Sequence, residues 1–339
     1  MTFSSAADRV PLRILVTGSR GKSSLVRLLT AALEGAGVHA AGRITGVLPR
    51  EIFDGKETLI LRSGPGSVDE MRWWLRSLPG KTKGAVLENS AVDPELQGLA
   101  WHWMKPSCTV LTNVRPDHEE VWGHGEEPAA AALCGGIGGG AVILPRSVAS
   151  VPAVSRILGM KGCELVPCPD GTGFRETHLS LVSGVCSFLG LDGKKALAAA
   201  REVAPDTADF RFFREGKGIL ASAFSANEPE STESLFQSTG WGRKETAVLY
   251  NSRKDRIARL RSFLPWLSGH SWKSVAVTGS RPLFLPPGAA FLPLRDSAEL
   301  EAFIASEGKV FGCGNVAGVP LEYLLGREER IDGEETTDD

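Results

Sequence analysis

The chain has 339 residues, of which 42% are hydrophobic and 23% charged, a composition typical of a soluble globular protein of about two domains. Its net charge of -2 excludes a strong overall field that would attract nucleic acid or an anionic membrane. The sequence contains no apolar run of about 18 residues, no signal-peptide core at its N-terminus and no CxxC pair among its six cysteines, which together favour a reduced cytoplasm.

Apolar runs that alternate with helical patterns predict an α/β fold. The first run is followed by an amphipathic pattern at 23–37 that ends at two glycines, as expected for a strand and its crossover helix. Each run is almost continuously hydrophobic, which is typical of parallel strands covered by helices on both faces. The predicted strands are 13–17, 85–89, 108–114, 141–145, 219–224, 246–251, 274–279 and 309–314.

A glycine-rich segment between the first strand and its helix predicts a phosphate-binding loop. In GSRGKS at 18–23, glycines allow backbone N–H groups to turn toward phosphates, although only two residues separate them instead of the usual four. Lys22 can reach the β- and γ-phosphates of a nucleotide, and the Ser23 hydroxyl can ligate Mg²⁺. The predicted nucleotide-binding residues of this segment are Gly18, Ser19, Arg20, Gly21, Lys22, Ser23 and Ser24.

Five letters of this motif, VTGSR, occur again at 277–281. The second copy has no lysine, and Pro282 removes a backbone donor where a phosphate loop would need one. We interpret it as an ordinary exit from a strand.

Polar side chains follow two later strands and extend the candidate site. Glu88 ends one strand, and Asn113, Asp117 and His118 follow the other. Because ligands of open α/β sheets bind outside the carboxyl ends of the strands, these groups are expected to converge on the phosphate loop. A carboxylate there would hold Mg²⁺, and an imidazole a second divalent ion. The alternative is that Glu88 caps a helix and His118 is a surface histidine.

Taken in order, the motifs resemble the Mur-ligase superfamily and, within it, the ATP-dependent ligase subunits of poly-γ-glutamate (capsule) synthases. The resemblance covers about residues 13 to 322 and begins with VTGSRGKSSLVRLL, GRITGVLPR, ENSAVDPELQ and TNVRPDHEEVWG. It continues with FRF at 210–212, AFSANEPEST, NSRKDR and FGCGNVAG. It implies a P-loop, Mur-ligase-like central domain at 1–208 and a smaller Rossmann-like α/β domain at 209–326, and the composition of 327–339 predicts a disordered acidic tail.

This resemblance implies an ADP-forming ligase of an acid and an amino acid. The γ-phosphate of ATP would pass to the carboxylate that ends a γ-glutamyl chain, and the amine of an incoming glutamate would displace phosphate from the acyl phosphate. Phosphorylation supplies the leaving group that a carboxylate lacks, but the meeting of two anions requires cations. Those cations would be Lys22, Mg²⁺ on Ser23 and Glu88, a second metal at His118, and Arg211.

The resemblance also assigns residues of the second domain. Arg253, Asp255 and Arg256 match an RxDR group, in which forked guanidinium groups suit a carboxylate or phosphate. A solvated helix face is the alternative for these charges. The implied roles are catalysis for Arg211 and Arg253, nucleotide contacts for Arg211 and Asp255, and substrate contacts for Arg253, Arg256, Asn227 and Asn315.

The chain departs from the family pattern at several places. Many Mur ligases hold a second metal with a carbamylated lysine, but no lysine occurs here between Lys105 and Lys161. His178 falls about where the superfamily has an adenine-contacting asparagine, and Asn113 is the other side chain expected at the nucleotide. The substrate-binding domain that precedes the P-loop in peptidoglycan ligases, and the membrane-associating extension of many capsule ligases, are expected to be absent.

The expected ligands are ATP, Mg²⁺ and glutamate or a γ-glutamyl chain, without nucleic acid. Family resemblance adds small membrane-embedded synthase subunits as partners of a cytoplasmic chain, and leaves a homo-oligomer open. Two other functions stay open: another Mur-like amino-acid ligase of the folylpolyglutamate type, and a non-catalytic P-loop protein that uses ATP as a switch. A second domain with its own cations favours a ligase over a switch.

Overall fold

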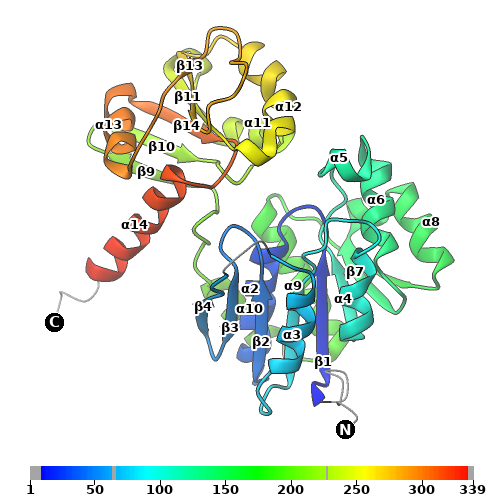
Figure 1. The fold of residues 1–339 in the computed structure, drawn as a ribbon. Coiled ribbons are helices and arrows are strands. Elements are labelled where there is room, and N and C mark those ends of the chain that lie inside the picture. The colour runs from blue at the N-terminus through cyan, green and yellow to red at the C-terminus, as the bar shows by residue number, and fades with distance from the viewer. Residues whose placement is uncertain (1–8, 63–65, 227, 335–339) are drawn as a thin grey trace. The chain divides into compact units, whose positions relative to one another are not determined.

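A computed structural model of the chain describes residues 9–62, 66–226 and 228–334. The chain divides into two compact units, Met1–Ala204 and Pro205–Asp339, whose folds are drawn in Figure 1. The division falls within the polar stretch 204–210. Across the described residues, no helix has the length and apolarity needed to cross a bilayer.

The described part of the first unit contains an eight-stranded sheet in the order β4-β3-β2-β5-β1-β6-β7-β8. Six neighbouring strands, from β2 to β8 in this order, run parallel, whereas β3 and β4 are added antiparallel at one edge. The strands are β1 (Leu12–Thr17), β2 (Ala40–Ile44), β3 (Arg50–Phe53), β4 (Lys56–Leu59), β5 (Gly84–Glu88), β6 (Cys108–Leu111), β7 (Ala141–Pro145) and β8 (Glu164–Cys168).

Helices cover both faces of this sheet and bury its apolar side chains. Helix α2 (Lys22–Gly35) packs on one face with α9 (Phe174–Leu189) and α10 (Gly193–Glu202). Its leucines are almost fully excluded from water, and burial of each contributes roughly 1.5–3 kcal/mol. The remaining helices of this unit are α3 (Asp69–Ser77), α4 (Gln97–Met104), α5 (Glu119–Trp122), α6 (Glu126–Gly135), α7 (Arg146–Ala149) and α8 (Pro152–Met160).

The second unit has its own core around a six-stranded sheet of described residues, in the order β13-β12-β11-β14-β10-β9. Only the edge strand β9 is antiparallel to its neighbour. The strands are β9 (Arg211–Glu215), β10 (Gly218–Ser222), β11 (Thr246–Ser252), β12 (Ser274–Gly279), β13 (Ala290–Phe291) and β14 (Lys309–Cys313), and the α-helices are α11 (Pro229–Ser238), α12 (Ile257–Ser268), α13 (Ser297–Glu307) and α14 (Val319–Glu334).

The structure confirms the α/β prediction and all eight predicted strands, but it adds others. The strands that the sequence did not predict are β2, β3, β4, β8, β9 and β13. Four of them, β4, β8, β9 and β13, are the edge strands of the two described sheets. The acidic tail also differs from the prediction. Helix α14 continues to Glu334, so 327–334 are helical rather than disordered, because arginine and glutamate are good helix formers despite their polarity. Residues 335–339 lie outside the described residues.

Candidate active site

The predicted phosphate loop connects β1 to α2 and depends on two glycines. Gly18 has φ 131° and Gly21 has φ 75°, conformations that side chains rarely adopt. A Cβ on Gly18 would lie 2.1 Å from Oγ1 of Thr112, so the loop approaches the segment after β6 too closely for any side chain.

That segment also holds the loop by hydrogen bonds. Thr112 Oγ1 and Asn113 Nδ2 both donate to the Arg20 carbonyl, at 2.6 and 3.0 Å. The Ser19 hydroxyl donates to the Arg115 carbonyl at 2.6 Å. Asn113 was predicted to contact nucleotide, and the structure gives its amide group a loop-tethering role, while its Oδ1 is buried without a hydrogen-bond partner in the described part of the chain.

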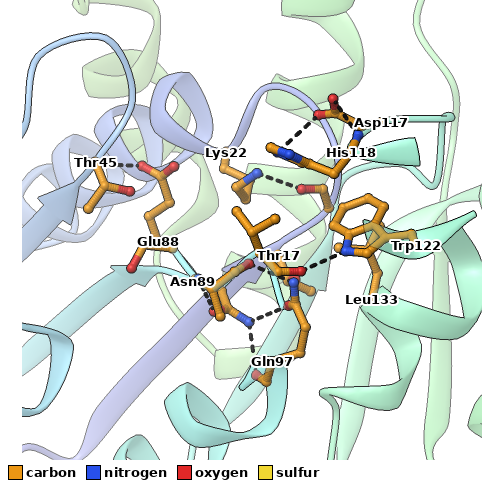
Figure 2. A pocket seen from close by; sticks show the side chains of 14 residues that line it. Thr17, Lys22, Thr45, Glu88, Asn89, Gln97, Asp117, His118, Trp122 and Leu133 are labelled. Carbon is orange, nitrogen blue, oxygen red and sulfur yellow. Dashed lines mark hydrogen bonds and ion pairs between the residues drawn. The ribbon is translucent and has the colours of Figure 1, made fainter. Parts of the chain in front are cut away.

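Lys22 lies over the loop, at the start of α2. Its Nζ donates to the Gly18 carbonyl at 2.7 Å (Figure 2). Burial lowers the pKa of Lys22, and the nearby carboxylates of Glu88 and Asp117 act in the opposite direction. An ammonium group that is poorly hydrated and close to the helix N-terminus is suited to bind phosphate oxygens.

Glu88 ends β5 and is only 4% exposed. Its Oε2 accepts hydrogen bonds from the Ser23 hydroxyl at 2.9 Å and from the Thr45 N–H at 2.8 Å. These bonds run to α2 and to the loop after β2, rather than to a helix that follows Glu88. A buried carboxylate and a hydroxyl at this separation are both ligands that a hard divalent cation prefers.

His118 has a left-handed backbone, φ 45°, immediately before α5. Its Nε2 lies 3.8 Å from Asp117 Oδ2 and its Nδ1 lies 3.7 Å from Glu120 Oε1. Within the described ranges, no group of three or more His, Cys, Asp or Glu side chains is placed to hold a metal ion. The role of His118 at a second metal therefore stays a prediction.

These elements surround a pocket of about 100 Å³ (Figure 2). Its wall after β5 is stabilised by Asn89 and Gln97, which are buried and bonded to each other at 3.0 Å. Both lie in the segment ENSAVDPELQ, but no spacing in the sequence distinguished them. The lining residues are Thr17, Gly18, Lys22, Thr45, Glu88, Asn89, Ser90, Ala91, Val92, Gln97, Asp117, His118, Trp122 and Leu133.

His178, on α9, lies against the other side of the loop. A Cβ on Gly21 would be 2.7 Å from the His178 ring and 2.3 Å from Phe174 Cζ. His178 is 3% exposed, and burial lowers its pKa to about 4, so the imidazole is neutral near pH 7. Its predicted contact with adenine stays a prediction. Phe174, half-exposed with its ring centroid 4.3 Å from that of His178, went unnoticed in the sequence.

The predicted cations of the second unit have protein partners. Arg253 forms a forked pair with Asp255, with Nε and Nη2 donating at 3.0 and 2.7 Å. Burial raises the pKa of Asp255, but the hydrogen bonds from Arg253 outweigh it and the net shift is downward. Arg256 precedes α12, and the Arg211 guanidinium lies 5.4 Å over the Phe213 ring.

Asn315 is 2% exposed and helps to hold the glycine-rich segment after β14. Its Nδ2 donates to the Asn251 carbonyl at 2.7 Å, and Asn251 returns the bond to the Asn315 carbonyl at 2.7 Å. Arg259, not noticed in the sequence, donates to Asn315 Oδ1. The predicted substrate contact of Asn315 is untested, and Asn227 lies outside the described residues.

A phosphate loop at the carboxyl edge of a parallel sheet, followed by a separate α/β unit, defines a Mur-ligase-like fold. Solved structures of this fold include E. coli FolC in complex with ADP, with TM-score 0.65, 15% identity and coverage of 97% of this chain and 91% of FolC. MurF from Acinetobacter baumannii matches with TM-score 0.63, 11% identity and coverage of 96% and 78%.

The sequence comparisons are more specific. Residues 207–330 match the family model described as the poly-gamma-glutamate synthase CapB C-terminal domain. The capsule biosynthesis protein CapB of Bacillus anthracis is 23% identical over an alignment of 363 residues including gaps, which covers 95% of this chain and 78% of that protein. The PGA synthase CapB of Bacillus subtilis (strain 168) is 26% identical over 284 residues, with coverage of 76% and 71%. The resemblance to capsule-synthase ligases is confirmed.

Proposed function

We propose that the chain is an ATP-dependent ligase that forms γ-glutamyl amide bonds through an acyl phosphate and releases ADP and phosphate. The observation that carries this proposal is the Ser23–Glu88 pair beside Lys22, in a chain similar to proteins named as capsule and PGA synthases. A switch protein would also need a phosphate loop, but it would need no resemblance to synthases along both units.

In the first step, an oxygen of the acceptor carboxylate forms a bond to the γ-phosphorus of ATP, and the bond to the β,γ-bridging oxygen breaks to release ADP. Lys22 would bind the oxygens on which charge accumulates, because its ammonium group already lies over the loop. In the second step, the neutral amine of glutamate attacks the acyl carbon, phosphate leaves, and the nitrogen loses a proton. The pocket walls would limit the competing attack by water.

The residues present fit one divalent cation, for which Mg²⁺ is our proposal. Ser23 Oγ and Glu88 Oε2 are 2.9 Å apart and would hold it. Since no group of three or more His, Cys, Asp or Glu side chains is placed to hold a metal ion in the described part of the chain, nucleotide oxygens and water would complete its coordination, as is usual for Mg²⁺. Once bound, the cation would neutralise phosphate charge.

The decisive experiment traps the intermediate. Purified protein is incubated with ATP, a short γ-glutamyl peptide and hydroxylamine in place of glutamate, and both hydroxamate and ADP are measured. The proposal predicts hydroxamate that depends on the peptide. The assay is run with and without bacterial membranes, because we also propose that small membrane-embedded subunits assist the chain.

Arg253→Ala serves as the variant in the same assay. The Arg253 side chain is 41% exposed, and among the described residues its guanidinium group pairs with the neighbouring Asp255 carboxylate. Its loss should therefore spare the fold. We expect hydroxamate formation to fall more than ATP affinity, because we assign the fork to a carboxylate or the transferred phosphate. Hydrolysis of ATP that ignores every carboxylate and yields no hydroxamate would instead identify an ATP switch.

A further inference from the structure

A buried arginine on β2 belongs to a charge cluster that the proposed function does not use. Arg43 is 1% exposed, and its Nη2 donates to Glu70 Oε2 at 2.6 Å. Its Nη1 is also buried, yet it has no hydrogen-bond partner in the described ranges. A buried guanidinium with an unmade hydrogen bond is costly, so its retention requires an explanation.

The same carboxylate binds a second arginine. Arg62 donates to Glu70 Oε2 through Nε at 3.1 Å and Nη2 at 2.7 Å, while Glu70 Oε1 accepts from the Ser67 N–H at 3.1 Å. Two guanidinium groups therefore share one carboxylate. Burial lowers the pKa of Arg43 and repulsion from Arg62 lowers it further, whereas the carboxylates of Glu70, Glu88 and Glu51 act in the opposite direction.

The cluster lies at the carboxyl ends of the parallel strands, where the phosphate loop also lies. Strand β2 is parallel to β5, and Thr45, two residues after Arg43, donates its N–H to Glu88. Because β3 is antiparallel to β2 and β4 is antiparallel to β3, β4 ends at the same end of the sheet as β2, and Arg62 follows three residues later. Glu88 is close enough to Arg43 to raise its pKa. An anion bound at the cluster would be a neighbour of the reacting groups.

Arg62 presents an accessible edge to such an anion. Its side chain is 25% exposed, and the contacts to Glu70 use Nε and Nη2. Gly66 packs against the guanidinium group: a Cβ there would lie 3.1 Å from Arg62 Cζ and Nη1 and 3.3 Å from Nη2. A side chain at position 66 would press on the guanidinium group, and Nη1 is the nitrogen of Arg62 that the described contacts to Glu70 leave for a planar carboxylate.

We propose that Arg62 is a binding residue for a carboxylate of the acceptor, and that Glu70 and Arg43 are the residues that position its guanidinium. A γ-linked glutamyl chain keeps an α-carboxylate on every residue, so one of them would lie near the γ-carboxylate that is phosphorylated. The identity of the ligand rests on the proposed function. The anion site itself rests on the two guanidinium groups that share one carboxylate, the unmade hydrogen bond of Arg43 and the 25% exposure of the Arg62 side chain.

The test measures binding rather than turnover. Calorimetry in the presence of a non-hydrolysable ATP analogue gives the affinity for γ-glutamylglutamate and for its analogue with α-carboxamides. Arg62→Ala should weaken the dipeptide about ten- to hundredfold, as expected for a lost charge-assisted hydrogen bond, and leave the affinity for ATP within about twofold. Arg72→Ala is the matched control, because Arg72 is an exposed arginine on α3 close to Glu70.

Glu70→Gln separates positioning from packing. If Glu70 orients Arg62, this variant should weaken the dipeptide but not the carboxamide analogue, whereas a packing defect would weaken both. Equal dipeptide affinities in Arg62→Ala and Arg72→Ala would overturn the proposal, as would no binding to the unaltered protein. Arg62-dependent binding without any hydroxamate would support the anion site and reject the ligase reaction, so the two failures are distinguishable.

Discussion

The geometry of the phosphate loop can be tested by matched substitutions of two glycines that flank helix α2. Gly21 precedes α2 with φ 75°, and Gly37 follows it with φ 83°. Alanine at either position would pay about 1–2 kcal/mol for the left-handed backbone. At Gly37 nothing else changes, because no atom lies within 4 Å of the new Cβ. Gly37→Ala should therefore lower the melting temperature by a few degrees and leave nucleotide binding unaffected.

Gly21→Ala adds a steric conflict. Phe174 can turn away because it is 51% exposed, but His178, 2.7 Å from the new Cβ, is buried at 3% exposure. Overpacking of this kind costs roughly 1–3 kcal/mol beyond the backbone strain, unless the loop itself moves. Either outcome displaces the N–H groups that precede α2, so we expect at least a tenfold loss of affinity for ATP.

The assay combines thermal unfolding with titration of a fluorescent ATP analogue for both variants. Gly21→Ala should be the less stable variant and the only one with weakened binding. Equal affinities in Gly21→Ala and Gly37→Ala would refute the inference that the left-handed turn at Gly21 positions the phosphate-binding backbone.

Three further predictions concern charge at the site. Lys22→Ala should abolish ATP turnover and leave the circular dichroism spectrum unchanged. Arg281→Ala is the control and should keep normal turnover, because Arg281 ends the second VTGSR and its guanidinium lies 5.4 Å over the Phe291 ring. Glu88→Gln should raise the Mg²⁺ concentration needed for half-maximal activity at least tenfold, and His118→Ala should lower the rate more than it lowers the affinity for ATP. If both variants kept the metal titration of the unaltered protein, the proposed roles of Glu88 and His118 at the metal would be rejected. The pKa of His178 is about 4 in the folded protein and near 6.5 in the unfolded chain, so the free energy of unfolding should fall by up to roughly 3 kcal/mol as the pH drops from 6.5 to 4. The urea midpoint of the unaltered protein should therefore decrease over this pH range, and that of His178→Gln should decrease less.

The sequence was most informative where function depends on consecutive residues. A phosphate loop needs glycines, a lysine and a hydroxyl between one strand and one helix, so GSRGKS could be located without knowledge of the rest of the fold. The strand ends gave the position of Glu88, because parallel strands end at a common edge. Its contact with Ser23, 65 positions earlier in the chain, follows from the order of β5 and β1 in the sheet.

Side-chain direction could not be predicted in the same way. Asn113 was placed correctly at the sheet edge, but nothing in the sequence indicated that its amide would bond to the Arg20 carbonyl. The Arg43, Glu70 and Arg62 cluster was missed for a related reason. Arg43 interrupts an apolar strand pattern, and only the packing of α3 on β2 shows that its charge is buried beside Glu70.

The short spacing between Gly18 and Gly21 also has a structural explanation. The Arg20 carbonyl points toward the segment after β6, where Thr112 and Asn113 donate to it. Because a trans peptide holds its carbonyl and N–H in opposite directions, the N–H of Gly21 must point away from that segment. The segment after β6 fixes this orientation from outside the loop, so loop and segment form one structural unit at the proposed phosphate site.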